Sequence, residues 1–434
     1  MGKKNILKIL LITLCLCVIM LFVIGVSGAK VPFLETYKTN FKHNITGFSN
    51  LFGIKLPIEM QLYLDDETPP EPKPTMIPAE DAEAFENPDG TETKEGTTEL
   101  QVRETVKPAK GEDVPVALDS AENYNYAELD GKIVAVNETN YYGYNSKGEL
   151  LWDIPIQMQQ PKVTVRGKYV LINETGAKKI LLFKEKKKVF ETSCKENIIS
   201  ADLSKKGDVV VVTEKKYYKG QVMVYNKRGE LIFAWGSGSY SILDAAISPK
   251  RKVAISLLNT DTGADSLIYC MDVNGKEKYK TGTFKNSVIF ELEFSGENLN
   301  AVADNRCIGI SAKGKTQWEH SFGGKTLTNL DIAVNGTKML LLEKDGIGEI
   351  MIISAKGKKY DSIKTESMPD AVSIKEDYLA YNSGRDIIVT DLKGKNVYRA
   401  SCGSDIKHMQ VIKKDKIFCA YSSSIQVKKP VKEK

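Results

Sequence analysis

The residues best placed to bind a metal ion lie in the segment NTDTGADS, residues 259–266. Asn259, Asp261 and Asp265 offer oxygen ligands at spacings of two and four residues, and Gly263 permits a sharp turn, as in part of a calcium loop. The segment lacks the distal glutamate that would complete such a loop. It also lies where two strand-like runs need a turn between them. We therefore interpret it as a hairpin turn, with calcium binding as the alternative.

Other residue patterns that could support catalysis are few. His320 and His408 are the histidines beyond residue 43, and neither has a neighbour at metal-ligand spacing, so structural roles are favoured. The serines of GSGSYS, residues 236–241, lack the second glycine of a nucleophile elbow, and a loop between two repeated units explains them. Nucleotide-binding and zinc-protease motifs are absent from the sequence. We assign no catalytic, cofactor-binding or metal-ligating residue and expect no enzymatic activity.

Five cysteines follow the N-terminal region, and they are far apart and odd in number. None belongs to a CxxC pair, so a zinc site is not expected. Each lies in or beside an apolar run, which favours buried free thiols, with one disulfide as the alternative in an oxidising compartment. They are Cys194, Cys270, Cys307, Cys402 and Cys419.

The elements that would position any functional side chain are repeated hairpins. A tetrapeptide that begins with Asn, Asp or Ser and ends with Gly recurs with glycine spacings of 81, 46, 39, 43 and 37 residues. A degenerate copy without glycine, LLFKEKKKVFE at residues 181–191, divides the first gap. The six intact copies are residues 145–148, 226–229, 272–275, 311–314, 354–357 and 391–394.

The tetrapeptide has the chemistry of a tight turn. Its first side chain can accept a hydrogen bond from the backbone two residues on, and its glycine can adopt the left-handed conformation. Apolar runs flank the turn, as in QVMVYN and ELIFAW, and two further runs precede it, as in SILDAAIS and KVAISLLN. Four strands in about 41 residues are typical of one blade of a β-propeller.

The repeats predict an all-β protein whose residues 116–434 form a propeller of about eight four-stranded blades, with seven as the second choice. Three runs near the C-terminus, HMQVIKK, KIFCAYS and SIQVKK, make an incomplete eighth unit. Its fourth strand is expected from VPVALD, residues 114–119, which would close the ring and remove its open edges. The complete units are residues 126–156, 162–194, 198–236, 241–284, 288–322, 328–364 and 370–401.

Two repeats, GYNSKGELLWDI and ISAKGKTQWEHSF, are similar to the tryptophan-containing repeats of quinoprotein-like propellers of the PQQ-like and WD40-like kind. The whole layout resembles an uncharacterised family of single-span bacterial surface proteins that carry a propeller. The resemblance implies that Trp152, Trp235 and Trp318 pack between blades, although Trp235 follows its glycine by six residues and the others by four. Tyrosines are expected to substitute in three other units, and they are Tyr279, Tyr360 and Tyr398.

The N-terminus predicts a membrane anchor. Residues 6–29 are a mostly apolar run with Lys8 as the only charged residue, and about 20 uncharged residues would span about 30 Å as a helix. Lys3 and Lys4 precede this run, which favours a cytoplasmic N-terminus and an exported body. We predict a single-pass signal-anchor helix within residues 1–30. A cleaved signal peptide is the alternative, because small residues at 27–29 resemble a cleavage site.

An acidic segment separates the anchor from the propeller. Residues 31–64 are expected to be a juxtamembrane segment, and residues 65–115 a disordered, proline-rich linker with few large apolar side chains. Residues 65–113 contain fifteen acidic and five basic residues, a net charge of −10. The lysines of the propeller are scattered without an aromatic stripe, which argues against nucleic acid as a partner.

These features predict a membrane-anchored, extracytoplasmic binding or scaffold module for a protein or cell-envelope partner. The alternative is a quinoprotein-like or hydrolytic enzyme whose site is assembled at the propeller channel from several blades. Three or more carboxylates or histidines converging there would favour the enzyme. Scattered lysines and tyrosines would favour the binding module.

Overall fold

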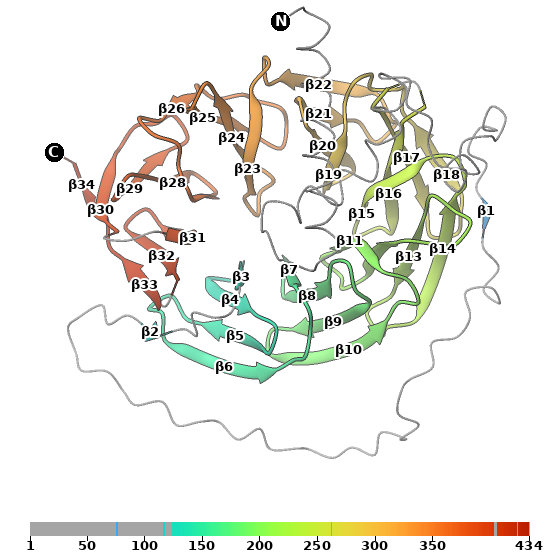
Figure 1. The fold of residues 1–434 in the computed structure, drawn as a ribbon, viewed down its shortest axis with the longest axis horizontal. Helices are drawn as coiled ribbons and strands as arrows, with labels where there is room; N and C mark the ends of the chain where they lie inside the picture. Colours follow the sequence, from blue (N-terminus) through green and yellow to red (C-terminus); the bar gives the residue numbers. More distant parts are fainter. Residues whose placement is uncertain are drawn as a thin grey trace, which may run out of the picture. The chain divides into compact units, whose positions relative to one another are not determined.

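A computed structural model describes residues 75–76, 116–117, 124–261, 263–402, 406–422 and 424–433. These residues form eight antiparallel sheets around a ring (Figure 1), which confirms an all-β, eight-bladed propeller. No helix in this part of the chain is long and apolar enough to cross a membrane. The predicted anchor at residues 1–30 and the juxtamembrane segment lie outside the described residues, as does the predicted linker except for residues 75–76.

The first four blades occupy residues 125–280. Blade 1 contains β3 (Asn125–Leu129), β4 (Lys132–Val136), β5 (Asn140–Tyr144) and β6 (Leu150–Pro155). Blade 2 contains β7 (Pro161–Arg166), β8 (Tyr169–Glu174), β9 (Lys179–Lys184) and β10 (Lys187–Ser193). Blade 3 contains β11 (Ile198–Leu203), β12 (Val209–Thr213), β13 (Gly220–Tyr225) and β14 (Leu231–Ser237). Blade 4 contains β15 (Ser241–Ile247), β16 (Lys252–Asn259), β17 (Asp265–Asp272) and β18 (Glu277–Lys280).

The remaining blades follow in chain order. Blade 5 contains β19 (Ile289–Ser295), β20 (Asn298–Ala303), β21 (Arg306–Ile310) and β22 (Thr316–Ser321). Blade 6 contains β23 (Thr326–Ile332), β24 (Lys338–Lys344), β25 (Ile347–Ile353) and β26 (Ile363–Lys364). Blade 7 contains β27 (Val372–Lys375), β28 (Tyr378–Ser383), β29 (Asp386–Asp391) and β30 (Tyr398–Ser401). Blade 8 contains β31 (Ile406–Lys413), β32 (Lys416–Tyr421) and β33 (Ser424–Lys428).

The eighth blade is completed by a strand from the other end of the propeller. β2 (Val116–Ala117) pairs antiparallel with β33, with Val116 opposite Ile425. The sheet order β2-β33-β32-β31 places β2 at its outer edge. The predicted ring closure by residues 114–119 is therefore confirmed, and it covers an edge that would otherwise be open to strand addition.

Two further short strands extend other blades. β1 (Thr75–Met76) pairs with β14 as a fifth strand of blade 3, and β34 (Val431–Lys432) pairs with β30 as a fifth strand of blade 7. Neither was predicted. Both consist of only two residues, too few for an alternating pattern to be recognised in the sequence. Thr75–Met76 belongs to the predicted linker and here forms a strand.

The repeated tetrapeptides form the predicted outer hairpin turns. The glycine of each intact copy has a φ between 72° and 84°, and its N–H donates to the carbonyl of the first residue at 2.9–3.0 Å. Asn145, Asn226, Asp272 and Asp391 accept from the backbone N–H two residues on. The copy without glycine differs, because β9 and β10 are joined by only two residues, Glu185 and Lys186, and Glu185 takes the positive φ of 53°.

The turn glycines also receive a side chain from the preceding blade. A Cβ placed on Gly314 of blade 5 would lie 2.7 Å from the Tyr279 ring of blade 4. A Cβ placed on Gly357 of blade 6 would overlap the Trp318 indole of blade 5. Phe190, Ile363 and Val427 meet the turn glycines of blades 3, 7 and 1 in the same way. Five of the six turn glycines thus contact a side chain of the preceding blade, four of them from its outermost strand and one from β33.

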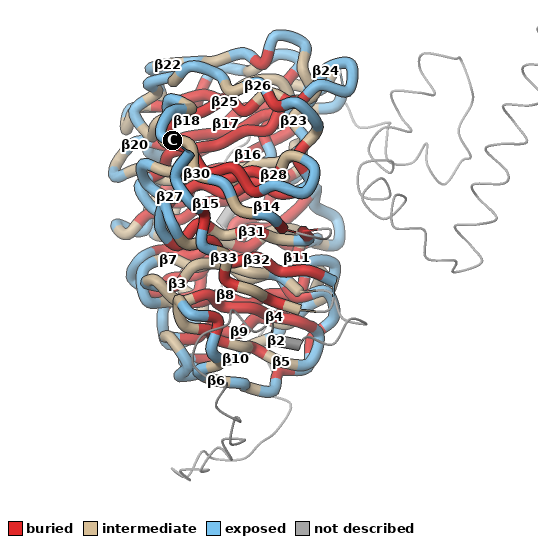
Figure 2. Tube along the Cα trace, turned by 90° about the vertical axis from the view of Figure 1, so that its left-hand side faces the viewer, coloured by how far each residue is buried: buried red, intermediate tan, exposed pale blue. Residues whose placement is uncertain are grey.

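The apolar cores lie between adjacent blades, as the repeats imply. Trp152, Trp235 and Trp318 pack in clusters shared by blades 1 and 2, 3 and 4, and 5 and 6 respectively, which confirms their predicted role. The outermost strands, such as β6 and β22, alternate between partly exposed and exposed residues (Figure 2). The five cysteines are buried free thiols, as predicted. Tyr279, Tyr360 and Tyr398 occupy equivalent inter-blade clusters.

We predict that Gly314→Ala lowers the free energy of unfolding by roughly 2 to 4 kcal/mol, because it combines left-handed strain with overpacking against Tyr279. Gly346→Ala is the matched control, since Gly346 has a φ of 78° and no atom within 4 Å of an added Cβ. Gly346→Ala should lower the free energy of unfolding only through backbone strain, by about 1 to 2 kcal/mol. Urea unfolding of both variants measures the difference, and equal losses would refute the packing contribution.

Candidate functional site

The innermost strand of every blade borders the central axis of the ring (Figure 1), which is the channel position of a propeller. Four neighbouring inner strands, those of blades 2 to 5, bring a mixed cluster of charged side chains to one side of it. Arg166 lies 3.6 Å from Asp202, measured from Nη2 to Oδ1. Burial alone lowers the pKa of the Arg166 guanidinium, but four carboxyl groups together raise it: Asp202, Glu293, Glu291 and Asp244.

Most of these carboxylates hold neighbouring blades together. Oδ2 of Asp202 accepts from the backbone N–H of Ile247 at 3.3 Å, and Oδ2 of Asp244 accepts from that of Leu292 at 2.8 Å. Each bond joins one inner strand to the inner strand of the next blade. Asp331 does the same for blades 6 and 7, because its Oδ2 accepts from the N–H of Ile374 at 2.7 Å.

Two lysine–glutamate pairs add to this bracing. The buried Nζ of Lys338 in blade 6 lies 3.2 Å from Oε2 of Glu293 in blade 5. Nζ of Lys375 in blade 7 lies 2.5 Å from Oε1 of Glu128 in blade 1. This pair therefore links two blades that are separated by blade 8. Removing one partner of such a pair would leave an uncompensated charge next to the protein interior.

Glu291 is different, because no hydrogen bond or ion pair to its carboxyl group is present within the described part of the chain. Burial raises the pKa of Glu291 to about 8, and the charge of Asp244 adds to that shift while Lys162 opposes it. Burial and the charge of Asp202 likewise raise the pKa of Asp244. A carboxylic acid that stays neutral near pH 7 can donate a proton or a hydrogen bond, so Glu291 is the channel's candidate for such chemistry.

The inner strands of blades 8 and 1 meet at an aromatic contact. His408 stacks on Tyr126 with ring centroids 4.8 Å apart, and Tyr124 stacks on Tyr126 at 6.0 Å. Burial lowers the pKa of His408 to about 4, so this ring is neutral near pH 7. Its Nε2 has no hydrogen-bond partner among the described residues. His408 therefore has a packing role, as the sequence suggested.

The metal candidate of the sequence forms the turn between β16 and β17. Oδ1 of Asn259 accepts from the N–H of Asp261 at 2.8 Å, and Oδ1 of Asp265 accepts from the N–H of Asn286 at 2.8 Å. Both side chains thus stabilise loop backbone. Among residues that the structure describes, no three histidine, cysteine or carboxylate side chains lie close enough to hold a metal ion.

The other candidates from the sequence also take structural positions. Nε2 of His320 lies 2.8 Å from the carbonyl oxygen of Gly357, linking blades 5 and 6. The serine-rich segment of residues 236–241 joins β14 to β15, and Oγ of Ser237 donates to the carbonyl of Tyr240 at 2.6 Å. It is the inter-blade loop that the sequence predicted.

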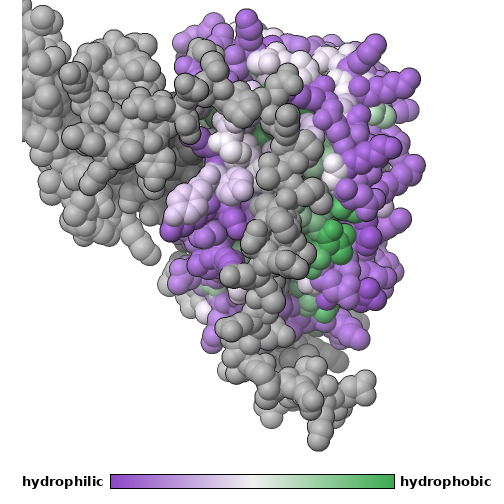
Figure 3. All heavy atoms as spheres, turned by 90° about the vertical axis from the view of Figure 1, so that its right-hand side faces the viewer, coloured by the Kyte–Doolittle hydropathy of each residue, from purple (hydrophilic) through white to green (hydrophobic). Residues whose placement is uncertain are grey.

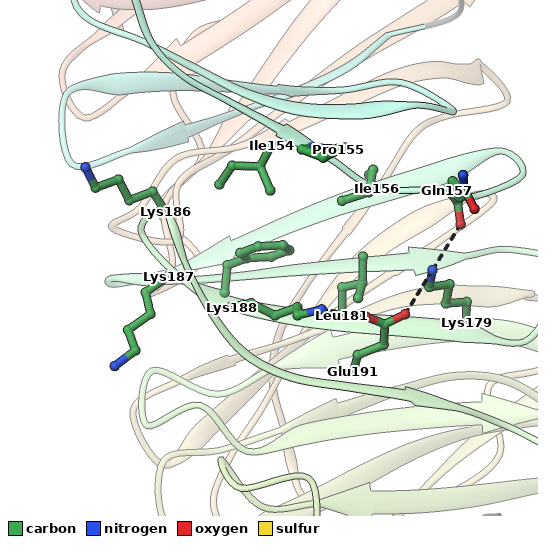
Figure 4. Close-up of a pocket in the computed structure, with 11 residues that line it drawn as sticks. Ile154, Pro155, Ile156, Gln157, Lys179, Leu181, Lys186, Lys187, Lys188 and Glu191 are labelled. Carbon is green, nitrogen blue, oxygen red and sulfur yellow. Dashed lines mark hydrogen bonds and ion pairs between the residues drawn. The ribbon is translucent and has the colours of Figure 1, made fainter. Parts of the chain in front are cut away.

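A groove of about 480 Å³ opens on the outer wall between blades 1 and 2 (Figure 4). Its floor is apolar and its rim is rich in lysine. Lys179 and Lys188 both pair with Glu191, at 2.9 and 2.8 Å. Lys186 and Lys187 project away from the other lining side chains (Figure 4), and no ion pair to either is present among the described residues. The apolar lining residues are Ile154, Pro155, Ile156, Leu181 and Phe183.

The face of the molecule drawn in Figure 3 is mostly hydrophilic where it is coloured, with small apolar areas. One loop stands out in composition: residues 214–219, which join β12 and β13 of blade 3. Tyr217 is 88% exposed and Tyr218 is 37% exposed, and three lysines flank them. Nζ of Lys216 lies 4.9 Å from the centroid of the Tyr217 ring. Tyr217 has a φ of 67°, a conformation that bulky residues rarely adopt.

Residues 108–429 match the family described as "Family of unknown function (DUF5711)". The chain belongs to this family. The match covers more than half of the chain and includes the whole ring from β2 through β33. No curated protein matches the chain.

The solved structures that match this DUF5711 member share little sequence with it. The crystal structure of BamB from Moraxella catarrhalis has 13% identity and a TM-score of 0.48, and the match covers 73% of this chain and 98% of that one. The Dos1 propeller has 12% identity and a TM-score of 0.48, with coverages of 70% and 90%. Hsv2 from Kluyvelomyces marxianus has 12% identity and a TM-score of 0.44, with coverages of 64% and 96%.

The channel carboxylates were not singled out from the sequence, although a signal for them exists. Asp244 and Glu291 each follow the register shift in an inner strand, at the same place in blades 4 and 5. Asp244 is the charged residue of SILDAAI, and Glu291 is the first of two glutamates in IFELEFS. A charged residue at the same position of two consecutive repeats could have marked the channel wall.

The raised pKa of Glu291 predicts a pH-dependent stability. The pKa in the folded state lies above the unfolded value of about 4.3, so ionisation opposes folding. The stabilising contribution is complete below about pH 4 and is lost as the pH rises through about 8. We predict that Glu291→Gln, which stays neutral, is more stable relative to wild type at pH 9 than at pH 5.

Urea unfolding midpoints at both pH values measure this effect. Glu138→Gln is the matched control, because Glu138 is an exposed glutamate outside the channel cluster. It should change stability by the same amount at both pH values. A Glu291→Gln variant that behaves like this control would contradict the assignment.

Proposed function

We propose that the protein is a membrane-anchored binding or scaffold module, with its propeller outside the cytoplasm and a protein or cell-envelope polymer as its partner. The observation that carries this proposal is the exposed loop of residues 214–219, in which Tyr217 and Tyr218 stand among lysines. Tyrosine is enriched at protein interfaces because its ring offers contact area and its hydroxyl a hydrogen bond. The unusual φ of Tyr217 adds to the argument, since backbone strain clusters at functional sites.

The arrangement of the channel supports binding over catalysis. Carboxylates do converge there, which by number alone favours an enzyme. However, Asp202 and Asp244 accept hydrogen bonds from neighbouring inner strands, and Glu293 pairs with Lys338. Side chains used in this way are not free to move with a reacting substrate.

The membrane anchor rests on the apolar run of residues 6–29 and the lysines before it. We predict that the full chain sediments with membranes after an alkaline carbonate wash, and that deletion of residues 6–29 releases it to the soluble fraction. Protease added to intact cells should cleave the propeller portion. A chain that is extracted by carbonate, or protected from the protease, would contradict this topology.

A photoreactive amino acid tests the binding loop. We predict that benzoylphenylalanine at Tyr217, introduced into the full chain in its native cells, gives a discrete adduct of higher mass. The matched control is the same substitution at Ile347, an apolar residue that is 60% exposed at the corresponding loop of blade 6. Adducts of equal yield at both positions, or none at Tyr217, would contradict recognition through this loop.

An enzyme that acts at the channel is the second candidate function, and Glu291 is the observation that favours it. Its raised pKa and its position beside Asp244 and Arg166 suit proton transfer in a hydrolytic reaction. A quinoprotein version would require a bound chromophore and a calcium-dependent rise in the melting temperature. Hydrolysis would instead be lost in Glu291→Gln without loss of the fold.

A further inference from the structure

We propose that the groove between blades 1 and 2 binds the acidic segment of the same chain, residues 77–115. The proposal concerns a different surface from the loop of blade 3 and does not depend on the identity of a partner. It rests on the chemistry of the groove, on the fixed ends of the segment, and on the complementarity of their charges.

The groove combines apolar surface with an excess of positive charge. Its lining contains four lysines and one glutamate, a net charge of +3. Glu191 satisfies Lys179 and Lys188, whereas Lys186 and Lys187 extend outward from the rim (Figure 4). A matching ligand therefore carries several carboxylates around at least one large apolar side chain.

The lysines are held in place by a contact between blades. The hydroxyl of the buried Tyr141 in blade 1 donates to the carbonyl of Glu185 at 2.9 Å, which fixes the hairpin that carries Lys186. This hairpin belongs to the repeat without a turn glycine, so the outer strand of blade 1 has no glycine to pack on. Trp152 lies over Gly143 of its own blade, as Trp318 lies over Gly309 of blade 5. The groove lies between the outer strand of blade 1 and this hairpin, in the repeat whose turn glycine is missing.

The acidic segment is attached at its two ends to blades 3 and 8, the blades that flank the two blades of the groove. β1 ends at Met76 on the outer edge of blade 3, and β2 begins at Val116 on the outer edge of blade 8. Blades 1 and 2 lie between those two blades. The 39 residues from 77 to 115 could span about 130 Å when extended, so length does not prevent contact.

The sequence of the segment matches the groove in charge and in apolar content. Residues 77–115 contain eleven acidic and four basic residues. The stretch EDAEAFENPD, residues 80–89, places five carboxylates around Phe85. Because both ends are attached to the ring, the effective concentration of this stretch at the groove is on the order of millimolar, and a weak interaction suffices to occupy it.

Zero-length cross-linking of the unmodified full chain tests the proposal. A water-soluble carbodiimide couples a lysine amine to a carboxylate only when the two are in contact, and peptide mass spectrometry locates the bond. We expect links from Lys186 and Lys187 to residues 80–89 at about tenfold higher yield than from matched lysines. The matched lysines lie in the outer hairpins of three distant blades and are Lys313, Lys356 and Lys393. Added salt should lower the yield, because the rim charges are exposed.

A second measurement shows whether the cross-linked acidic peptide belongs to the same copy of the chain or to another copy. In a mixture of isotopically light and heavy chains, links within one copy support the proposal, and links between copies assign the groove to a second molecule and overturn it. Equal yields at the matched lysines would also overturn it. Phe85→Ser should lower the yield at Lys186 and Lys187 while the matched lysines stay unchanged. These results are independent of any adduct formed at Tyr217.

Discussion

The ring depends on contact between each blade and the next, because a single four-stranded sheet cannot bury its apolar faces by itself. On the outer wall this contact is made by a side chain of one blade against the turn glycine of the following blade, as for Tyr279 on Gly314. The same glycine supplies the left-handed turn. Glycine thus meets a backbone requirement in all six intact copies of the tetrapeptide and a packing requirement in five of them.

The inner wall uses polar contacts for the same purpose. Asp202, Asp244 and Asp331 accept hydrogen bonds from the strand of the following blade, where a side chain of the channel can satisfy a backbone N–H. Burying these carboxylates raises their pKa values, so the bracing that holds the ring also gathers charge around Glu291. The carboxylates that join neighbouring blades therefore also set the electrostatic environment of Glu291.

The turn residues made the architecture predictable, and the same residues explain the limits of prediction. The spacing of the glycines indicated the number of blades, and the incomplete last repeat indicated the closing strand at residues 114–119. Strands of two residues, such as β1, carry no period and could not be recognised. The channel cluster could not be assembled either, since Arg166, Asp244 and Glu291 come from three blades and only the closed ring brings them together. The only sequence signal for the lysine-rimmed groove was the repeat that lacks its turn glycine.

The closing strand has a consequence for the order of folding. β2 precedes every other strand of the eight four-stranded blades, yet its Val116 pairs with Ile425 of β33, so the last contact of the ring joins residues about 300 positions apart. A chain still being synthesised would have seven blades able to form and an eighth that lacks its partner strands. Such long-range pairing forms slowly and exposes strand edges until it is complete. Truncation near the C-terminus should therefore produce aggregation during synthesis, even where the lost residues touch only one blade.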